Sequence, residues 1–375
     1  MASKRNIFED VTDANAAAAQ VSSTTSAHND QGWIILWLKL MFLMVALIIV
    51  VGGLTRLTDS GLSITEWAPI SGVVPPLSAE AWQIEFEKYQ KIPEFLIQNS
   101  SMTMSEFQYI YLWEWGHRLL ARLLGFVWFV GLVVFAVRRS IPRGWTGRLV
   151  LLGVLGAVQG FVGWWMVSSG LSGRMVDVAS YRLAIHLGLA FIILGLITWY
   201  VMSIGRGEKE MLQARRRREV GIGNWATVLA CLIFVQMLIG ALVAGLDAGR
   251  GYTDWPLMGG KFFPDGAFNA EPAWTNFFEN VALTQFNHRI LAYCTAIAVI
   301  FFWWLSRQSA LNALRSWATT LAIFTALQVL VGIVTVLYAA PLNIAIVHQF
   351  GAIVLWVVAL ATVFNARYPR AQSLR

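Results

Sequence analysis

Eight long apolar runs constrain this chain more than any other feature of its sequence. They lie near residues 33–54, 117–137, 148–168, 183–204, 223–246, 288–306, 316–337 and 344–365. Each is long enough to cross a bilayer as a helix, which takes about 20 apolar residues. Because the bilayer core offers the backbone no hydrogen-bond partner, only helices and closed barrels span it. The sequence therefore predicts an all-α integral membrane protein with eight transmembrane helices.

The composition agrees with a membrane location. Hydrophobic residues make up 57% of the 375 residues and charged residues only 13%, whereas soluble domains carry about 25% charged residues. A net charge of +7 would suggest a nucleic-acid partner for a soluble protein. Here the basic residues gather in short loops between apolar runs, so we expect membrane lipid as the contact and no nucleic acid.

The distribution of Lys and Arg predicts the orientation. Eight spans place both termini on one side, and that side holds 17 Lys and Arg against 10 on the other. Because basic loops stay in the cytoplasm, both termini are expected there, and the long loops 56–112 and 247–287 are expected outside. Residues 1–32 are polar and rich in Ala and Ser, which is typical of a disordered cytoplasmic tail.

Four histidines each open an alternate span on the predicted outer side. They are His117, His186, His288 and His348, whereas His28 lies in the polar tail. One such histidine could equally be an interfacial residue with a single hydrogen bond. Four at one depth instead indicate paired imidazoles, which is how helical bundles hold haem iron.

Arg118 and Arg289 directly follow two of these histidines. A haem is apolar and carries two anionic propionates, and guanidinium groups bind carboxylates well. We therefore predict that both arginines contribute to haem binding at the rim of the pockets.

The two halves of the chain repeat one another. The segment "EWGHRLLA" (114–121) matches "QFNHRILA" (285–292), and "LGAVQGFVGWW" (155–165) matches "TALQVLVGIVTV" (325–336). Both units run in the same direction, which is typical of a parallel repeat about a pseudo-twofold axis along the membrane normal.

The repeat predicts two tandem four-helix bundles. The first covers residues 33–205 and the second residues 223–366, with a basic cytoplasmic linker at 206–222 and a short tail at 367–375. Each bundle would hold one histidine pair. The pairs are His117 with His186, and His288 with His348.

The halves differ beside the first histidine of each pair. Gln285 stands in the place of Glu114, so only the first half has a carboxylate one turn from its histidine. Proton-coupled chemistry needs an acid or base and electron transfer does not. We therefore assign the chemistry to the first bundle and electron transfer to the second. The alternative is that Glu114 is only an ion-pair partner of Arg118, four residues further on.

The first outer loop carries helix signals. Ser78 suits the N-cap of a short amphipathic helix that ends before Pro93, and Thr103 with Glu106 has the pattern of a capping box. The second helix would continue into the next span and carry Glu114 inward. These helices either cover the first site or only anchor the loop at the membrane surface. Periodicity predicts no fold for residues 244–266.

Several motifs resemble those of the haem A synthase family. They are "GGLTRLTDSGLSITEWAPISGVVPPLS" (52–78), "EWGHR" (114–118), "GLDAG" (245–249), "WPLM" (255–258) and "NHR" (287–289). The resemblance covers nearly the whole chain from residue 33 onward. The long first outer loop is similar to that of the alphaproteobacterial and mitochondrial branch. The outer-loop cysteine pair of the shorter branch is missing here, so no redox role for such a pair is carried over.

This resemblance implies an oxidoreductase that converts haem O to haem A for assembly of a terminal oxidase. One porphyrin methyl group would become a formyl group through an alcohol and a gem-diol. The resemblance implies that His288 and His348 ligate the iron of haem b, and that His117 and His186 face the iron of the substrate haem beside Glu114.

The resemblance also implies a bacterial inner membrane, with the haem sites toward the periplasm, and haem O synthase as a pathway partner. The residues do not identify the electron donor, and a homo-oligomer is compatible with them. Two other classes stay open on the residues alone. A quinol-oxidising type of cytochrome would carry haem b only and would not need Glu114. A transporter would place its ionisable residues near mid-membrane, whereas these lie at span ends.

Overall fold

The computed structural model describes residues 14–173 and 175–371, and its side chains from residue 31 onward. The eight membrane-length helices are α1 (Ala14–Leu57), α4 (Met104–Val137), α5 (Thr146–Val167), α6 (Ser180–Ile204), α8 (Val220–Gly245), α10 (Val281–Ser306), α11 (Asn312–Leu337) and α12 (Leu342–Arg367). The short elements are α2 (Ala79–Tyr89), α3 (Pro93–Ile97), α7 (Glu208–Arg217), α9 (Asn276–Glu279) and the 3-10 turns Ser71–Val73, Ala248–Arg250 and Ala273–Thr275. The all-helical prediction with eight spans is confirmed.

The helix starts differ from the predicted span starts. His117 lies more than three turns inside α4, and the other three histidines lie about two turns inside their helices. The helices therefore begin before the apolar runs that the histidines open, as the capping box at Thr103 predicted for α4. Apolarity marks where a helix enters the bilayer, whereas polar caps such as Thr103 and Asn280 set where it begins.

The first helix also begins earlier than expected. α1 starts at Ala14, within the segment that composition predicted to be a disordered tail, while residues 1–13 of that tail lie outside the described residues. Residues 14–19 include five alanines. Alanine has the highest helix propensity, so this segment can extend the apolar helix that follows it.

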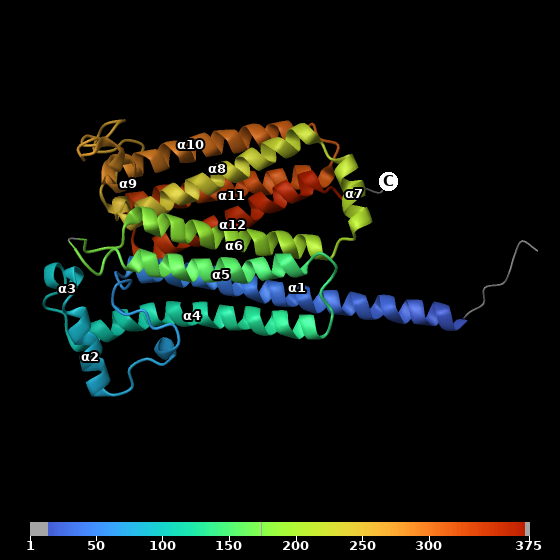
Figure 1. Cartoon of the computed structure of the whole chain (residues 1–375). Coiled ribbons are helices and arrows are strands. Elements are labelled where there is room, and N and C mark those ends of the chain that lie inside the picture. The colour runs from blue at the N-terminus through green and yellow to red at the C-terminus, as the bar shows by residue number, and fades with distance from the viewer. Residues whose placement is uncertain (1–13, 174, 372–375) are drawn as a thin grey trace, which may run out of the picture.

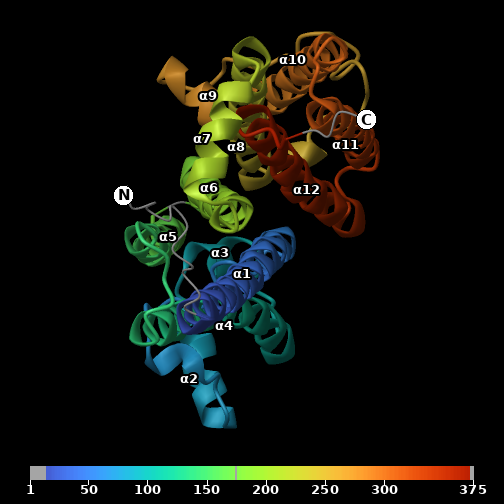
Figure 2. The ribbon, with the colours of Figure 1, turned by 90° about the vertical axis from the view of Figure 1, so that its right-hand side faces the viewer.

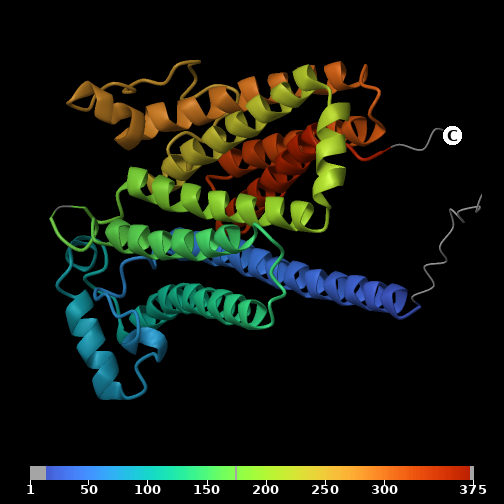
Figure 3. The same ribbon diagram turned by 45° about the vertical axis from the view of Figure 1, so that its right-hand side comes forward.

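The long helices lie side by side, and α1 extends beyond the others at one end (Figure 1). The start of α1, the end of α12 and the short helix α7 lie at one end of the bundle, and α2, α3 and α9 lie at the other. Figure 3 shows α2 projecting beyond the helix ends. We call the end that carries α2, α3 and α9 the outer end, in keeping with the predicted orientation.

Seen along the helices, α4 and α5 lie on one side and α10 and α11 on the other, with α1, α6, α8 and α12 between them (Figure 2). The helices of the first half (α1, α4, α5 and α6) pack against one another as do those of the second half (α8, α10, α11 and α12). The contact of α1 with α4 corresponds to that of α8 with α10, α5 with α6 to α11 with α12, and α1 with α6 to α8 with α12. The two halves contact each other through α1 and α6 on one side and α8 and α12 on the other. The tandem repeat itself stays a prediction.

Burial follows this arrangement. In α6 half of the membrane-spanning window is buried (50%), whereas in α4 and α5 almost none is (0% and 6%). The core gathers around α6 and includes Phe191, Leu194 and Ile197, which are almost fully buried. The outward faces of α4 and α5 carry large apolar side chains such as Phe126 and Phe161. A bilayer provides the apolar surroundings that such faces need.

The first outer loop forms a small core of its own. The helix caps at Ser78 and Thr103 are confirmed, the latter as a reciprocal capping box with Glu106. Phe107, in the first turn of α4, is fully buried, and its ring lies 4.9 Å from that of Phe86. α2 therefore packs its aromatic face onto α4 and holds the loop against the outer end of the first half.

Candidate functional site

The two histidines of the second half face one another. The ring centroids of His288 on α10 and His348 on α12 lie 6.4 Å apart, with an interplanar angle of 84°. Imidazole nitrogens bind a metal at about 2 Å, so two rings on opposite sides of one iron have centroids about 6 Å apart. The spacing of this pair fits one metal ion between the rings.

A glycine lies against the Cε1 edge of each of the four predicted histidines. The pairs are Gly52 with His117, Gly163 with His186, Gly240 with His288 and Gly332 with His348. A Cβ atom built on these glycines would lie 2.8, 2.9, 3.0 and 3.0 Å from the respective Cε1 atoms. Any side chain there would push the imidazole, so the glycines fix how deeply each ring sits between its helices.

Three of the histidines also have a glutamine partner. The amide nitrogens of Gln159, Gln236 and Gln328 lie 3.2, 3.0 and 3.3 Å from Nδ1 of His186, His288 and His348. Each amide donates to the main-chain carbonyl oxygen of the same histidine, at 3.0, 2.9 and 2.8 Å. Groups that hold a histidine ligand in place are a common feature of metal sites.

The first pair is built differently from the second. His117 lies on α4 and packs against Gly52, but the residue one turn before Gly52 is Ile48, where the other three helices have glutamine. His117 thus lacks the glutamine contact that the other three imidazoles have.

Glu114 is buried one turn before His117. Its side chain is 4% exposed, and both carboxylate oxygens are occupied. One oxygen accepts hydrogen bonds from Ser63 Oγ (2.7 Å) and the main-chain N–H of Ile64 (2.8 Å). The other accepts from Nε and Nη2 of Arg118, at 3.0 and 2.6 Å. The ion pair with Arg118 that the residue spacing allowed is therefore present.

The two predicted rim arginines hold the outer loops. Arg118 donates to the carbonyl oxygens of Ile64 (3.0 Å) and Glu66 (3.2 Å). Arg289 donates to those of Tyr252 (2.9 Å), Asp254 (2.8 Å) and Leu257 (2.9 Å). Each guanidinium thus fastens the start of one long loop over its half of the bundle. Nε of Arg289 is buried without a partner.

Gln285, which matches Glu114 in sequence, also holds an outer loop. It is 1% exposed, and its amide donates to the carbonyl oxygen of Tyr252 (3.0 Å). Its Oε1 atom is buried without a partner. Both residues therefore tie the loop to the helix, but Glu114 does so with a carboxylate and Gln285 with a neutral amide.

Acidic side chains gather around Arg56 at the outer end of α1. The guanidinium lies 2.8 Å from Asp59, 3.5 Å from Asp177 and 2.7 Å from Asp247, which follows α8. Burial raises the pKa of Asp177, and Arg56 opposes that shift. Burial, together with nearby carboxylates, raises the pKa of Glu94 to about 8.

The glutamines and glycines beside the histidines were not predicted as site residues. They share a four-residue spacing on one helix face, as Gln159–Gly163, Gln236–Gly240 and Gln328–Gly332. The spacing recurs in three helices and could have been found as part of the repeat. Its meaning depends on which helix packs against which, and that is visible only in three dimensions.

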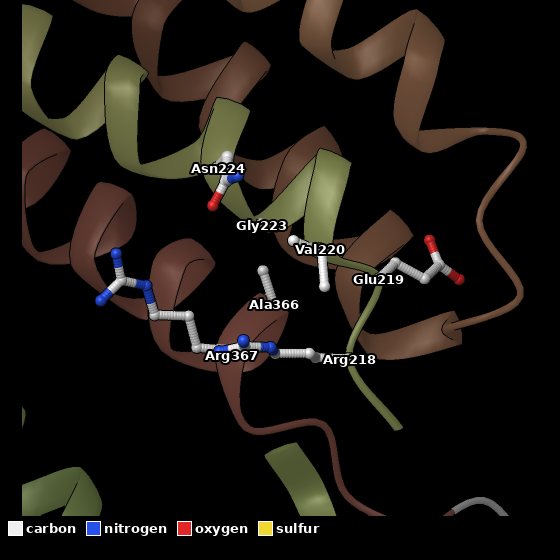
Figure 4. A pocket seen from close by; sticks show the side chains of 7 residues that line it. All are labelled: Arg218, Glu219, Val220, Gly223, Asn224, Ala366 and Arg367. Atoms are coloured by element: carbon white, nitrogen blue, oxygen red, sulfur yellow. The ribbon is translucent and has the colours of Figure 1, made fainter. Parts of the chain in front are cut away.

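A small pocket of about 200 Å³ lies at the opposite end of the bundle (Figure 4). It is lined by Arg218, Glu219, Val220, Gly223, Asn224, Ala366 and Arg367. The figure shows Glu219 and Arg367 extending to opposite sides of it. Among the described residues no group of three or more His, Cys, Asp or Glu is placed to hold a metal ion, so the histidine pairs remain the candidate site.

Comparison with known proteins agrees with the geometry. Residues 35–360 match the model of the cytochrome oxidase assembly protein family. The chain is 55% identical to a protein of Dinoroseobacter shibae named Heme A synthase, over all of this chain and 99% of the relative. Two further proteins of that name, from Roseobacter denitrificans and Paracoccus denitrificans, are 51% and 50% identical over 98% or more of both chains.

Proposed function

Because this chain belongs to the cytochrome oxidase assembly protein family, we propose that it is a membrane enzyme that oxidises haem O to haem A. The relatives that match over its full length carry the name Heme A synthase. The product would serve the assembly of a terminal oxidase in a bacterial inner membrane. We place both termini in the cytoplasm and the histidine pairs toward the periplasm.

The difference between Glu114 and Gln285 carries this proposal. Two histidine pairs are framed by glycines in the same way, yet only one has a buried carboxylate on the same helix face. Electron transfer alone would not require that difference. The first half is therefore the half we assign to methyl oxidation.

In the first half, the substrate haem would lie between His117 and His186. Glu114 would direct water or a proton toward the methyl carbon, or stabilise positive charge that develops there. With water as the oxygen source, each of two stages would add one hydroxyl group to the methyl carbon and release two electrons and two protons. The stages would give an alcohol and then a gem-diol that loses water, and the electrons would leave to an external acceptor. Arg118 would keep Glu114 and the start of the outer loop in place over the site.

In the second half, His288 and His348 would hold haem b. Their 6.4 Å ring spacing suits one iron, and Gln236 and Gln328 hold the imidazoles in place. A haem b held by these residues would supply single-electron transfer for the first half. Arg289 is fastened to loop carbonyl oxygens, and its free Nε is the donor that a propionate could use. Haem O synthase is the pathway partner we expect.

Extraction of the haems from purified protein tests this proposal. Wild-type protein should contain haem b together with haem O or haem A, separable by chromatography. His288→Ala should lose haem b, and Glu114→Gln should keep haem b and accumulate haem O. Gln285→Glu is a matched control for the second half and should leave the conversion of haem O in place.

Two results would contradict the proposal. Haem b alone in the wild type, even with haem O supplied, would indicate an electron-transfer cytochrome. Haem A made by Glu114→Gln at the wild-type rate would remove the chemical role of Glu114 and leave it as a loop anchor.

A further inference from the structure

An apolar groove of about 400 Å³ opens on the membrane-facing flank of α5. Its lining residues are Trp67, Ala157, Gly160, Phe161 and Trp164. Four of them lie on α5, and Trp67 comes from the outer loop, where its ring meets that of Trp164 edge-on at 6.2 Å. This volume is within the range of small-molecule sites, roughly 300–1,000 Å³. No residue of the groove has a part in the chemistry described above.

The groove adjoins the substrate side of the first half. Gly163 packs against His186, and Gly160 lies three residues earlier on the same helix, about 60° around its axis. Gln159, next to Gly160, donates to the carbonyl oxygen of His186. A flat ligand at His186 would therefore have its edge near the inner end of the groove.

The matching residues of the second half are different. Alignment of Gln159 with Gln328 puts Val329 in the place of Gly160 and Ile333 in the place of Trp164. The outer loop there also carries a tryptophan, Trp255, but its indole N–H donates to Tyr293 of α10, at 2.8 Å. A groove lined by Gly160 and by the rings of Trp67 and Trp164 is thus a feature of the first half.

We propose that this groove binds the long isoprenoid chain of the substrate haem and so selects that haem over haem b. This inference rests on the proposed function, in which the first half binds haem O and the second half binds haem b. Haem O carries a long isoprenoid chain that haem b lacks. A branched, water-insoluble chain suits a wall of tryptophan and phenylalanine rings. Because α5 is almost unburied, the substrate can enter from the bilayer with its chain leading along the groove.

A lipid acyl chain is the competing occupant. Acyl chains would cover all outward apolar faces alike, including that of α11, where Val329 and Ile333 stand in the places of Gly160 and Trp164. The groove lies instead at the outer end of α5, under Trp67 of the loop that Arg118 and Glu114 fasten. Its position beside His186 favours the substrate chain.

The test is a binding titration of the purified protein with haem b already bound, in lipid nanodiscs. The probes are haem O and, separately, further haem b, each followed by absorbance. Wild type should bind haem O more tightly than the added haem b. Gly160→Val should weaken haem O binding about tenfold, the effect of displacing one or two methylene groups, and leave the affinity for added haem b unchanged.

Two further variants test whether misfolding, rather than a filled groove, weakens haem O binding. Gly147→Val makes the same change at an exposed position of α5 that has no neighbour within 4 Å, and it should bind haem O as wild type does. Trp67→Ala removes one wall without filling the groove and should also weaken haem O binding selectively. All variants should retain the haem b held by His288 and His348.

Equal affinity of Gly160→Val and wild type for haem O would overturn the groove assignment alone. A phospholipid that co-purifies with wild type and is lost from Gly160→Val, with haem O affinity unchanged, would make the groove a lipid site and overturn it as well. Failure of wild type to bind haem O at all would overturn the proposed function together with this inference.

Discussion

The guanidinium of Arg118 binds one carboxylate oxygen of Glu114 through two of its nitrogens, at 3.0 and 2.6 Å. The other oxygen of Glu114 is held by the start of the outer loop, at Ser63 and Ile64. One buried carboxylate thus joins α4, its own arginine and the loop that covers the first half. The contacts with Arg118, Ser63 and Ile64 therefore fix the position of the Glu114 carboxylate beside His117.

The Glu114–Arg118 pair should be strongly coupled. Arg118→Met leaves the buried carboxylate without its cation, and loss of one partner of a buried pair costs about 3–5 kcal/mol. Thermal unfolding in detergent should show a clear decrease in Tm, with faster proteolysis of loop 56–112. The double variant Glu114→Gln/Arg118→Met should recover part of the loss, because no charge is left unpaired. Additive effects would show that the two side chains stabilise the loop independently.

Gln236 should be needed for tight haem b binding. Gln236→Ala removes the group that holds His288 in place, and such changes lower metal affinity about 10–100-fold. The haem b content after purification and its loss to a competing haem-binding protein measure the effect. Gln159→Ala is the same change beside His186 and should leave haem b in place. Equal retention by both variants would argue against haem b at His288.

Gly332 should tolerate no side chain. A Cβ atom there would lie 3.0 Å from Cε1 of His348, so Gly332→Ala should tilt or displace the imidazole. We expect a reduced haem b content and an altered absorption spectrum of the remainder. Gly125→Ala, at a position with nothing within 4 Å, serves as the control on helix propensity. An unchanged spectrum in Gly332→Ala would mean that the ring has room to move.

Arg56 should join the two halves at the outer end. Its 2.7 Å contact with Asp247 links α1 to the loop after α8, and its side chain is only 11% exposed. Arg56→Gln should lower the Tm. Lys261→Gln breaks the exposed pair with Asp265 and should change the unfolding free energy by no more than about 1 kcal/mol. Similar small effects of both variants would show that Arg56 does not contribute more than a surface ion pair.

Glu94 should make stability depend on pH. Burial raises the pKa of Glu94 from 4.5 to about 8, so the folded protein keeps a proton that the unfolded chain releases above pH 4.5. The contribution of this carboxyl to stability is therefore fully present below pH 4.5 and is lost as pH rises toward about 8. Glu94→Gln cannot ionise, so its Tm should rise relative to wild type between pH 5 and pH 8. A constant Tm difference across that range would contradict the raised pKa.

Much of this architecture could be predicted from local features. The eight spans follow from apolar runs of sufficient length, and the caps at Ser78 and Thr103 follow from residue types at fixed spacing. The four histidines and Glu114 were identified because they are rare polar residues at equivalent places in a repeat. The helices start before the apolar runs that identified them, because a helix can continue beyond the apolar part of its sequence.

The sequence by itself determined the membrane class, the number of spans and the residue types at the site, because a bilayer acts on each segment separately. Only the tertiary structure decided what those residues touch. Arg118 reaches the carbonyl oxygen of Ile64, 54 residues away, and Gly332 meets His348 across two helices. Such contacts depend on how loops fold back and how helices pack, and no local pattern specifies them.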